Sequence, residues 1–438
     1  MRISYPDAAM NEPDRPRPLS PSDLRTFALA SLGGALEFYD FIIYVFFAPL
    51  IGRLFFPPGL PGWLDGVKDF GLFAAGYLAR PLGGLLMAHF GDTIGRKRMF
   101  TLSVLLMAIP TLIAGLLPDF AAFDRYGIGY AAPLILLGLR MLQGAAIGGE
   151  APGAWVFVAE HAPRGRVGFA CGLLTAGLTF GILLGALVAM AMHAMCSPAE
   201  LAAWGWRIPF LLGGLFGLCA MALRRRLRET PVFLAMQAEA SRAERLPIGE
   251  VVARHRFGVA VSMAATLMLT GAIVVVILMT PALLQLHRHL SAPLTLRANV
   301  AACVAMTVSV VLTGRALDRF DILAVALVEG AGLIASVYAL YLFADIPGAL
   351  LPLCVLAGVF VGIVAVVPAL MVRVFPPAVR FTGLAFSYNL AYALFGGLTP
   401  LVVSTLIVRT PLAPAHHVAI ATLAGVGAIA LARRRGLI

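Results

Sequence analysis

The chain has 438 residues, of which 60% are hydrophobic and only 13% charged, and its mean hydropathy of +0.91 excludes an ordinary soluble protein. A net charge of +11 would suit a nucleic-acid partner. However, the basic clusters 224–226 and 433–435 flank apolar runs, as expected of anchors at a membrane surface. We therefore predict an all-α polytopic membrane protein that does not bind nucleic acid.

Apolar runs predict twelve transmembrane helices, because a bilayer requires about 20 apolar residues per helical span. The predicted spans are 24–50, 70–90, 100–117, 131–159, 167–192, 208–223, 259–286, 298–317, 322–343, 349–374, 381–408 and 413–432. They form two six-helix halves joined by one long hydrophilic connection. The excess of Lys and Arg on one set of loops places that connection and both termini in the cytoplasm. The predicted parts are a tail (1–23), a first half (24–223), a central loop (224–256), a second half (257–432) and a tail (433–438).

A polar turn follows the second span of each half. Residues 88–100 read AHFGDTIGRKRMF and residues 314–321 read GRALDRFD, so Asp92 corresponds to Asp318. This echo indicates a duplication. A carboxylate at such a turn can accept hydrogen bonds from free amides at a helix N-terminus. We predict that both turns are inter-helix latches on the cytoplasmic side.

Two carboxylates lie inside the first predicted span. Glu37 and Asp40 are three residues apart and share a helix face. Because a charged carboxylate at the bilayer midplane costs about 3 kcal/mol, each requires a partner, a proton or water. A structural ion pair with an arginine is one interpretation, and proton coupling or substrate contact is the other. We favour Asp40 for the proton, since Phe38, Tyr39 and Phe41 would desolvate it.

Two arginines also lie inside predicted spans, and burying their charge in the membrane is as costly as burying that of the two carboxylates. Arg80 lies about halfway along the second span and requires a carboxylate, water or an anionic substrate. Arg140 and Glu150 lie in the fourth span, ten residues or about 15 Å apart, too far to pair directly. We predict that Arg140 belongs to the proton or substrate path, with a structural lock as the alternative. For Glu150, proton coupling and a structural role stay equally open.

Polar side chains near these charges are candidate substrate contacts, namely Tyr39 and Gln143. In the eleventh span Tyr388 and Asn389 precede two glycines and Pro400. We expect a broken helix there that exposes polar groups to a cavity, although packing is an alternative.

Two further features have structural interpretations. Glycines predict close helix packing in the fourth and fifth spans, at Gly144, Gly148, Gly149, Gly177, Gly181 and Gly185. Glu329 is expected to pair with Arg315 or Arg319.

The sequence argues against several function classes. It has no glycine-rich loop followed by Lys-Ser/Thr, so we expect no ATP hydrolysis. Its histidine pairs lack a third nearby ligand, and we predict neither a metal nor another cofactor. We find no nucleophile–base pair that would indicate an enzyme and no added signalling domain that would indicate a sensor. The remaining energy source is an ion gradient.

The motifs together resemble a known family. The turn AHFGDTIGRKR and the segment LRMLQGAAIGGE are similar to the loop signature and the fourth-span arginine motif of the major facilitator superfamily. GGALEFYDFIIY, YLARPLGG, WGWRIPF, RETPVF and RFTGLAFSYNLAYALFGGLTP resemble the metabolite:proton symporter family, whose members carry α-ketoglutarate, citrate, shikimate, proline or betaine. The resemblance implies proton coupling at Arg140. It also implies latch residues at Asp92, Gly95, Arg96 and Lys97, with Asp318 and Arg319 in the second half.

Our prediction from the sequence is proton-coupled symport, by alternating access, of a small mono-, di- or tricarboxylate into the cell. Arg80 and Arg140 motivate an anionic substrate. The alternative is a zwitterion such as proline or betaine. The expected proton-coupling residues are Asp40, Glu37, Arg140 and Glu150, and the expected substrate contacts are Arg80, Arg140, Tyr39, Gln143, Tyr388 and Asn389. We expect a monomer in a bacterial-type inner membrane, with a small organic anion and the proton as its partners.

Overall fold

The computed structural model describes residues 19–57, 59, 71–84, 96–163, 165–224 and 247–438. Within these ranges the chain is helical and has no strands. The helices of the first half are α1 (Pro21–Phe55), α3 (Arg96–Leu116), α4 (Phe120–Asp124), α5 (Ala131–Gly148), α6 (Glu150–His161), α7 (Val167–Met195), α8 (Pro198–Glu200), η2 (Leu201–Gly205) and α9 (Arg207–Arg224). Residues 71–84 are helical as well.

The second half is helical throughout its described length. Its elements are α11 (Pro247–Arg254), α12 (Arg256–Thr270), η4 (Gly271–Met279), α13 (Thr280–Arg288), α14 (Ala292–Ala316), α15 (Ile322–Phe343), α16 (Leu350–Phe360), η5 (Val361–Ala365), α17 (Val366–Val374), η6 (Pro377–Val379), α18 (Arg380–Ala391), η7 (Tyr392–Gly396), α19 (Gly397–Ile407) and α20 (Ala413–Arg434).

Nine helical stretches among the described residues are long and apolar enough to cross a membrane. The bent pair of Pro198–Gly205 and Arg207–Ala222, the shorter apolar helix Leu102–Leu116 and the helical residues 71–84 account for the other three predicted spans. The all-α polytopic fold is therefore as predicted. The bounds of the two halves stay predictions, since most of the central loop lies outside the described residues.

The first helix shows how local sequence sets an element's limits. The Ser20 hydroxyl accepts from the Asp23 amide at 3.2 Å, and the Asp23 carboxylate accepts from the Ser20 amide at 2.9 Å, which forms a capping box. Pro21 suits the first helical position. The helix ends at Phe55 because Phe56, which precedes Pro57, is extended. It is thus longer than predicted at both ends.

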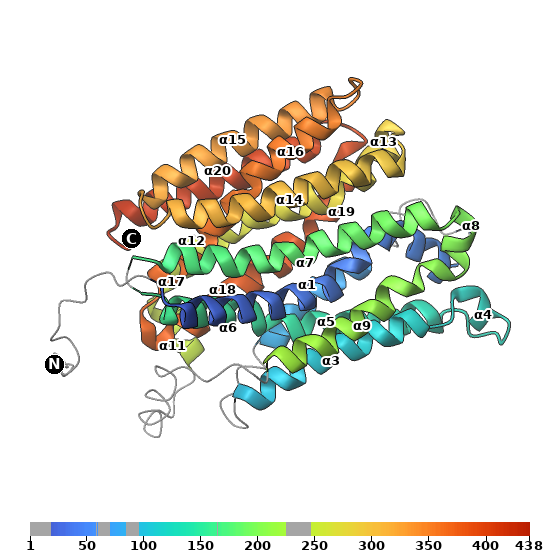
Figure 1. Cartoon of the computed structure of the whole chain (residues 1–438), viewed down its shortest axis with the longest axis horizontal. Coiled ribbons are helices and arrows are strands. Elements are labelled where there is room, and N and C mark those ends of the chain that lie inside the picture. The colour runs from blue at the N-terminus through green and yellow to red at the C-terminus, as the bar shows by residue number, and fades with distance from the viewer. Residues whose placement is uncertain (1–18, 58, 60–70, 85–95, 164, 225–246) are drawn as a thin grey trace.

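The two halves lie side by side along their length. In Figure 1, α7 of the first half runs beside α14 of the second, and their contact is the most extensive between any two described helices. The first helix begins and α20 ends at the same end of the bundle (Figure 1), which is the predicted cytoplasmic end.

Glycines let the second and fourth spans cross closely. A Cβ on Gly144 would lie 1.8 Å from the Gly76 carbonyl oxygen, and one on Gly148 would lie 2.3 Å from the Arg80 carbonyl oxygen. No side chain fits at either position, so the predicted small-residue packing is confirmed there. The backbone carrying Arg80 is consequently held directly against the fourth span.

The first and fifth spans also approach each other closely at glycines. A Cβ on Gly177 would lie 2.5 Å from the Ser31 carbonyl oxygen, and one on Gly181 would lie 2.2 Å from that of Ala35. These positions confirm the packing predicted for this span.

The eleventh span differs from its prediction. Instead of a break, the chain passes from α18 through the π-helical segment η7 into α19, with Pro400 inside that last helix. A π-helical segment absorbs the irregularity while keeping backbone hydrogen bonds, which an unwound stretch in a membrane would lose.

Candidate functional site

The polar cluster shared by the two halves surrounds Arg80, which is 1% exposed. Its guanidinium carbon lies 5.5, 5.3 and 4.3 Å from the ring centroids of Tyr77, Tyr388 and Tyr392. The face of an aromatic ring carries negative potential and attracts a cation at such distances. We call these three residues the tyrosine cage.

The tyrosine cage joins the two halves. Tyr77 belongs to the second span, whereas Tyr388 lies in α18 and Tyr392 begins η7. The rings of Tyr77 and Tyr392 are stacked with centroids 5.2 Å apart, and those of Tyr388 and Tyr392 are 4.7 Å apart. All three residues are buried. A displacement of one half against the other would therefore open or close the cage.

Asn389 holds Arg80 at this position. Its Oδ1 accepts a hydrogen bond from Arg80 Nε at 3.3 Å, and its Nδ2 donates to the carbonyl oxygens of Gly148 and Ala385. Arg80 Nη2 has no hydrogen-bond partner, and no carboxylate forms an ion pair with Arg80, among the described residues. The guanidinium therefore has a donor available for an anion.

The second buried arginine, Arg140 of α5, has its partners within the first half. Its Nη1 donates to the Phe41 carbonyl oxygen at 3.2 Å and to Gln143 Oε1 at 2.8 Å. Gln143 Nε2 donates in turn to Thr111 Oγ1 at 2.7 Å. The Arg140 guanidinium carbon lies 4.6 and 4.7 Å from the ring centroids of Phe41 and Tyr44. Gln143 thus positions Arg140 and is not brought to the tyrosine cage.

Two aromatic rings in contact with each other connect the surroundings of the two arginines. Arg140 lies over Phe41 and Arg80 over Tyr77, and these two rings meet edge to face with centroids 5.1 Å apart. Arg140 contacts Phe41 and Arg80 contacts Tyr77, so the two cations have different ring partners within one aromatic pair. One anion-binding cavity containing both cations stays a prediction.

Asp40 is 1% exposed and faces α9 of its own half. A Cβ on Gly213 would lie 2.6 Å from Asp40 Oδ1 and 2.8 Å from the Thr111 methyl group, so this glycine makes room for both. Among the described residues neither Asp40 carboxylate oxygen has a hydrogen-bond partner. Such a carboxylate is costly when it is charged. It lies beside Thr111, which accepts from Gln143 and donates to the Met107 carbonyl oxygen at 2.8 Å.

The structure does not bring Tyr39 to the tyrosine cage. Its hydroxyl donates to the Pro209 carbonyl oxygen at 2.9 Å, and its ring packs against Phe216 at 4.9 Å. The predicted substrate contact is thus a packing contact with α9. Glu37 and Glu150 are buried, on α1 and in the first turn of α6.

Asp318, in the second of the two repeated turns, contacts a helix of the other half. Its two carboxylate oxygens accept hydrogen bonds from the Gly168 and Phe169 amides at 2.7 and 3.0 Å, so an acid of the second half caps α7 of the first. Burial raises the pKa of the Asp318 carboxyl above its usual value, although both amides oppose this shift. Arg319 is exposed.

The first copy of this latch is only partly described. Asp92 and Gly95 lie outside the described residues. Arg96 and Lys97 open α3, but their side chains are likewise outside the description. The latch function of all these residues stays a prediction.

Glu329 corrects another expectation. Its Oε1 accepts from Thr313 Oγ1 at 2.8 Å, and no ion pair with Arg315 or Arg319 forms among the described residues. Arg315 instead lies over the ring of Phe169, 5.0 Å from its centroid. The acid contacts Thr313 of α14, whereas Arg315 of the same helix extends to Phe169 of α7.

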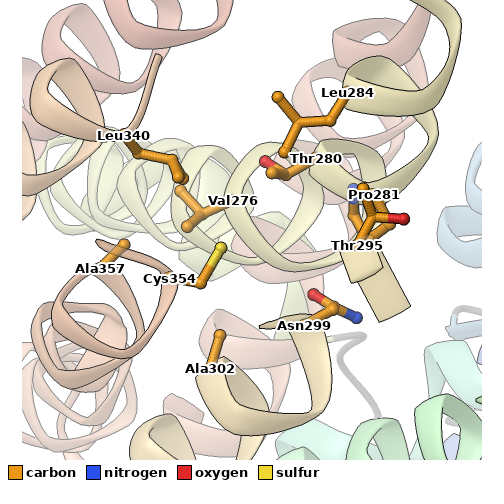
Figure 2. Close-up of a pocket in the computed structure, with 10 residues that line it drawn as sticks. All are labelled: Val276, Thr280, Pro281, Leu284, Thr295, Asn299, Ala302, Leu340, Cys354 and Ala357. Carbon is orange, nitrogen blue, oxygen red and sulfur yellow. The ribbon is translucent and has the colours of Figure 1, made fainter. Parts of the chain in front are cut away.

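A separate pocket lies entirely within the second half. Figure 2 shows Thr280, Thr295 and Asn299 toward one side and Leu340 and Cys354 toward the other. None of its lining side chains is charged. It therefore offers less to a charged solute than the tyrosine cage does. No group of His, Cys, Asp and Glu in the described ranges is arranged to hold a metal ion.

Sequence reasoning missed Tyr77, Tyr392 and Trp155. The last packs edge to face on Tyr388, with centroids 4.9 Å apart. Helical spacing carried part of the signal, since Tyr77 precedes Arg80 by three residues and Tyr388 precedes Tyr392 by four. Nothing in that spacing indicates that the two pairs meet.

A helical membrane protein made of two halves, with buried charged groups at and beside their contact, belongs to the class of secondary transporters. The sequence model of the Major Facilitator Superfamily matches residues 30–400. The chain belongs to this superfamily and, within it, to the metabolite:proton symporter family predicted from the motifs. It is accordingly a multi-pass membrane transporter.

Two relatives and one solved structure illustrate this membership. The chain is 30% identical to the glycine betaine/proline/ectoine/pipecolic acid transporter OusA of Dickeya dadantii, over 87% of this chain and 77% of the relative. It is 28% identical to the proline/betaine transporter of Escherichia coli, over 92% and 81%. The proton:xylose symporter XylE bound to 6-bromo-6-deoxy-D-glucose has the same fold, with a TM-score of 0.75, 17% identity and coverage of 94% and 95%.

Proposed function

We propose that the protein carries a small zwitterionic solute of the proline and betaine type into the cell together with protons, by alternating access. The observation that carries this proposal is Arg80 within the tyrosine cage, at the contact of the two halves. A zwitterion offers a carboxylate to the guanidinium and a cationic nitrogen to the ring faces. A mono-, di- or tricarboxylate would use the arginine but leave three rings without a cation.

The relatives support the same class of substrate. OusA and the Escherichia coli protein are transporters of proline, betaine, ectoine or pipecolic acid by their names. These solutes combine a carboxylate with a cationic nitrogen-containing group. The organic acid favoured by the sequence analysis has less support than the zwitterion that was its alternative.

Proton coupling is assigned to the first half. Asp40 takes up the proton from outside and releases it after the transporter opens inward. Arg140 is connected through Gln143 to Thr111, which lies beside Asp40, in contacts that do not involve the second half. Glu37 and Glu150 are the further candidates. This assignment is supported by the burial of all four charged side chains in spans that pack together.

The location follows from the charge pattern and the fold. We propose a monomer in a bacterial-type inner membrane with both termini in the cytoplasm. The Asp318 contact with α7 would then hold the cytoplasmic ends of the halves together.

Uptake into proteoliposomes tests the substrate class. Labelled betaine, proline, citrate, α-ketoglutarate and shikimate are supplied with and without an inward proton gradient. We expect gradient-dependent accumulation of betaine or proline and none of the three acids. Accumulation of an acid alone would restore the organic-acid interpretation and overturn this proposal.

A further inference from the structure

We infer that Arg80 is a built-in competitor for the tyrosine cage: its guanidinium occupies the ring faces that receive the cationic group of the substrate, and leaves them when a substrate carboxylate is there to bind it. This inference rests on the proposed function, because it assumes that the substrate carries both charges. It adds that the transporter binds weakly any solute that carries only one of these two charges.

The geometry shows that the cage is filled by the protein itself. The Arg80 guanidinium carbon lies 4.3 Å from the Tyr392 centroid, within the range at which a cation binds a ring face. Tyr77 and Tyr388 complete its surroundings, and each of these residues is 3% exposed or less. A second cation cannot reach the same ring faces while the guanidinium is there.

Arg80 and Arg140 are the two buried arginines among the described residues, and they are held in different ways. Arg80 Nε donates to Asn389 Oδ1 at 3.3 Å, and Nη2 lacks a partner among the described residues. By contrast, Arg140 and Arg207 also lie over aromatic rings, but each donates two hydrogen bonds from Nη1 to oxygen atoms. A planar guanidinium with free donors binds a carboxylate in a two-pronged geometry that ring faces do not offer.

The exchange of partners makes recognition depend on two groups together. Choline carries the trimethylammonium group without a carboxylate, so it offers no anion that would draw the Arg80 guanidinium away from the rings. 3,3-Dimethylbutyrate has the shape and carboxylate of betaine with an uncharged tert-butyl group, so it draws Arg80 away but gains no cation–π attraction. Only betaine satisfies both the guanidinium and the rings.

Calorimetric titration of the purified full-length protein tests the inference with these three probes. We expect the wild-type protein to bind betaine about tenfold or more tightly than either choline or 3,3-dimethylbutyrate. In Arg80→Gln, the rings are freed, and choline binding should strengthen by about tenfold while betaine binding weakens by a similar factor. Arg207→Gln is the matched control, since Arg207 also lies over a ring, that of Trp206, and is not part of the cage. Its affinities should match those of the wild type.

A second pair of variants separates the ring from the hydroxyl. Tyr392→Phe keeps a ring face and should keep the choline affinity of the Arg80→Gln background within about threefold, whereas Tyr392→Leu should abolish the gain. Equal choline affinity in the wild type and in a folded Arg80→Gln protein would overturn the inference, even if betaine is transported. A gain in choline binding would support it, even if uptake assays replaced the proposed zwitterion by another solute.

Discussion

Arg80 and Arg140 are two arginines of the same half, both almost fully buried and both over aromatic rings, yet their partners differ. Arg80 contacts Tyr388, Tyr392 and Asn389, all of the second half. Arg140 takes every partner that the structure gives it from its own half. The environment of Arg80 must therefore change when the halves move, whereas that of Arg140 can persist.

We propose on this basis that Arg80 binds substrate and that Arg140 serves proton coupling. A substrate site in a rocking transporter lies between the moving halves. A group that couples the proton needs a defined neighbourhood throughout the cycle, and Gln143 with the Phe41 carbonyl supplies one for Arg140. The following predictions test this division, from the largest expected effect to the smallest.

Forcing apart the helices that carry the two arginines should damage both sites at once. Gly144→Val places a side chain where a Cβ alone would lie 1.8 Å from the Gly76 carbonyl oxygen. We expect a loss of about 3 kcal/mol or more in the free energy of unfolding, because the backbones cannot both keep their positions. Thermal unfolding of the solubilised protein measures it. Gly138→Val on the same helix is the control, since a Cβ there meets no atom within 4 Å, and an equal loss in both variants would contradict the packing argument.

Removing the proposed proton carrier should abolish uphill transport. Asp40→Asn keeps the shape that fits beside Gly213 but cannot release a proton. We expect no accumulation of betaine against its gradient, while exchange of internal for external betaine continues. Both are measured in proteoliposomes. Undiminished uphill uptake would remove Asp40 from the mechanism.

Replacing Arg140 should separate coupling from binding. Arg140→Gln leaves the contacts of the tyrosine cage in place, because among the described residues Arg140 donates hydrogen bonds to Phe41 and Gln143 and lies over the rings of Phe41 and Tyr44. We expect gradient-driven accumulation to fall about tenfold while betaine affinity stays within about threefold, since only the coupling free energy is affected. Titration calorimetry and uptake report the two quantities separately. If both fell together, the two arginines would form one functional site.

The smallest effect is expected at the contact between the halves made by Asp318. Asp318→Asn weakens two hydrogen bonds to the Gly168 and Phe169 amides, which is worth about 1 kcal/mol. Hydrogen exchange at the start of α7 should therefore accelerate by about fivefold. Asp321→Asn is the matched control, because Asp321 caps α15 within its own half through the Leu323 and Ala324 amides. Faster exchange of α7 in the control would show that the effect does not come from the contact between halves.

Much of the fold follows from local sequence. Runs of apolar residues determine helical spans, because a lipid environment leaves the backbone few other ways to satisfy its hydrogen bonds. Ser20 and Asp23 determine where α1 begins, and Gly144, Gly148, Gly177 and Gly181 mark surfaces on which helices approach closely. In these cases the deciding interactions lie within one helix or depend on side-chain size alone. The repeated turn indicated an acid close to the N-terminus of the next helix, but the packing of the two halves decides that Asp318 accepts from amides of α7.

The site could be predicted only as a set of costly residues. Arg80, Arg140, Asp40, Tyr388 and Asn389 stand out because charged and polar groups are expensive in lipid. Spacing along one helix could not show that Tyr39 turns toward α9. It could not show either that Glu329 meets Thr313, since each of these contacts involves a second helix.

The sequence by itself determined the class of the protein, its helices, its family and the charged residues that require an explanation. The tertiary structure decided which of them meet. Arg80 and Asn389 are 309 positions apart, and their contact depends on how the two halves pack. The same packing decided that Arg80 lies in a cage of tyrosines and that Arg140 has Phe41 and Gln143 as its partners. The sequence determines the chemistry of each side chain, but the packing of the helices determines which partner a buried charge meets.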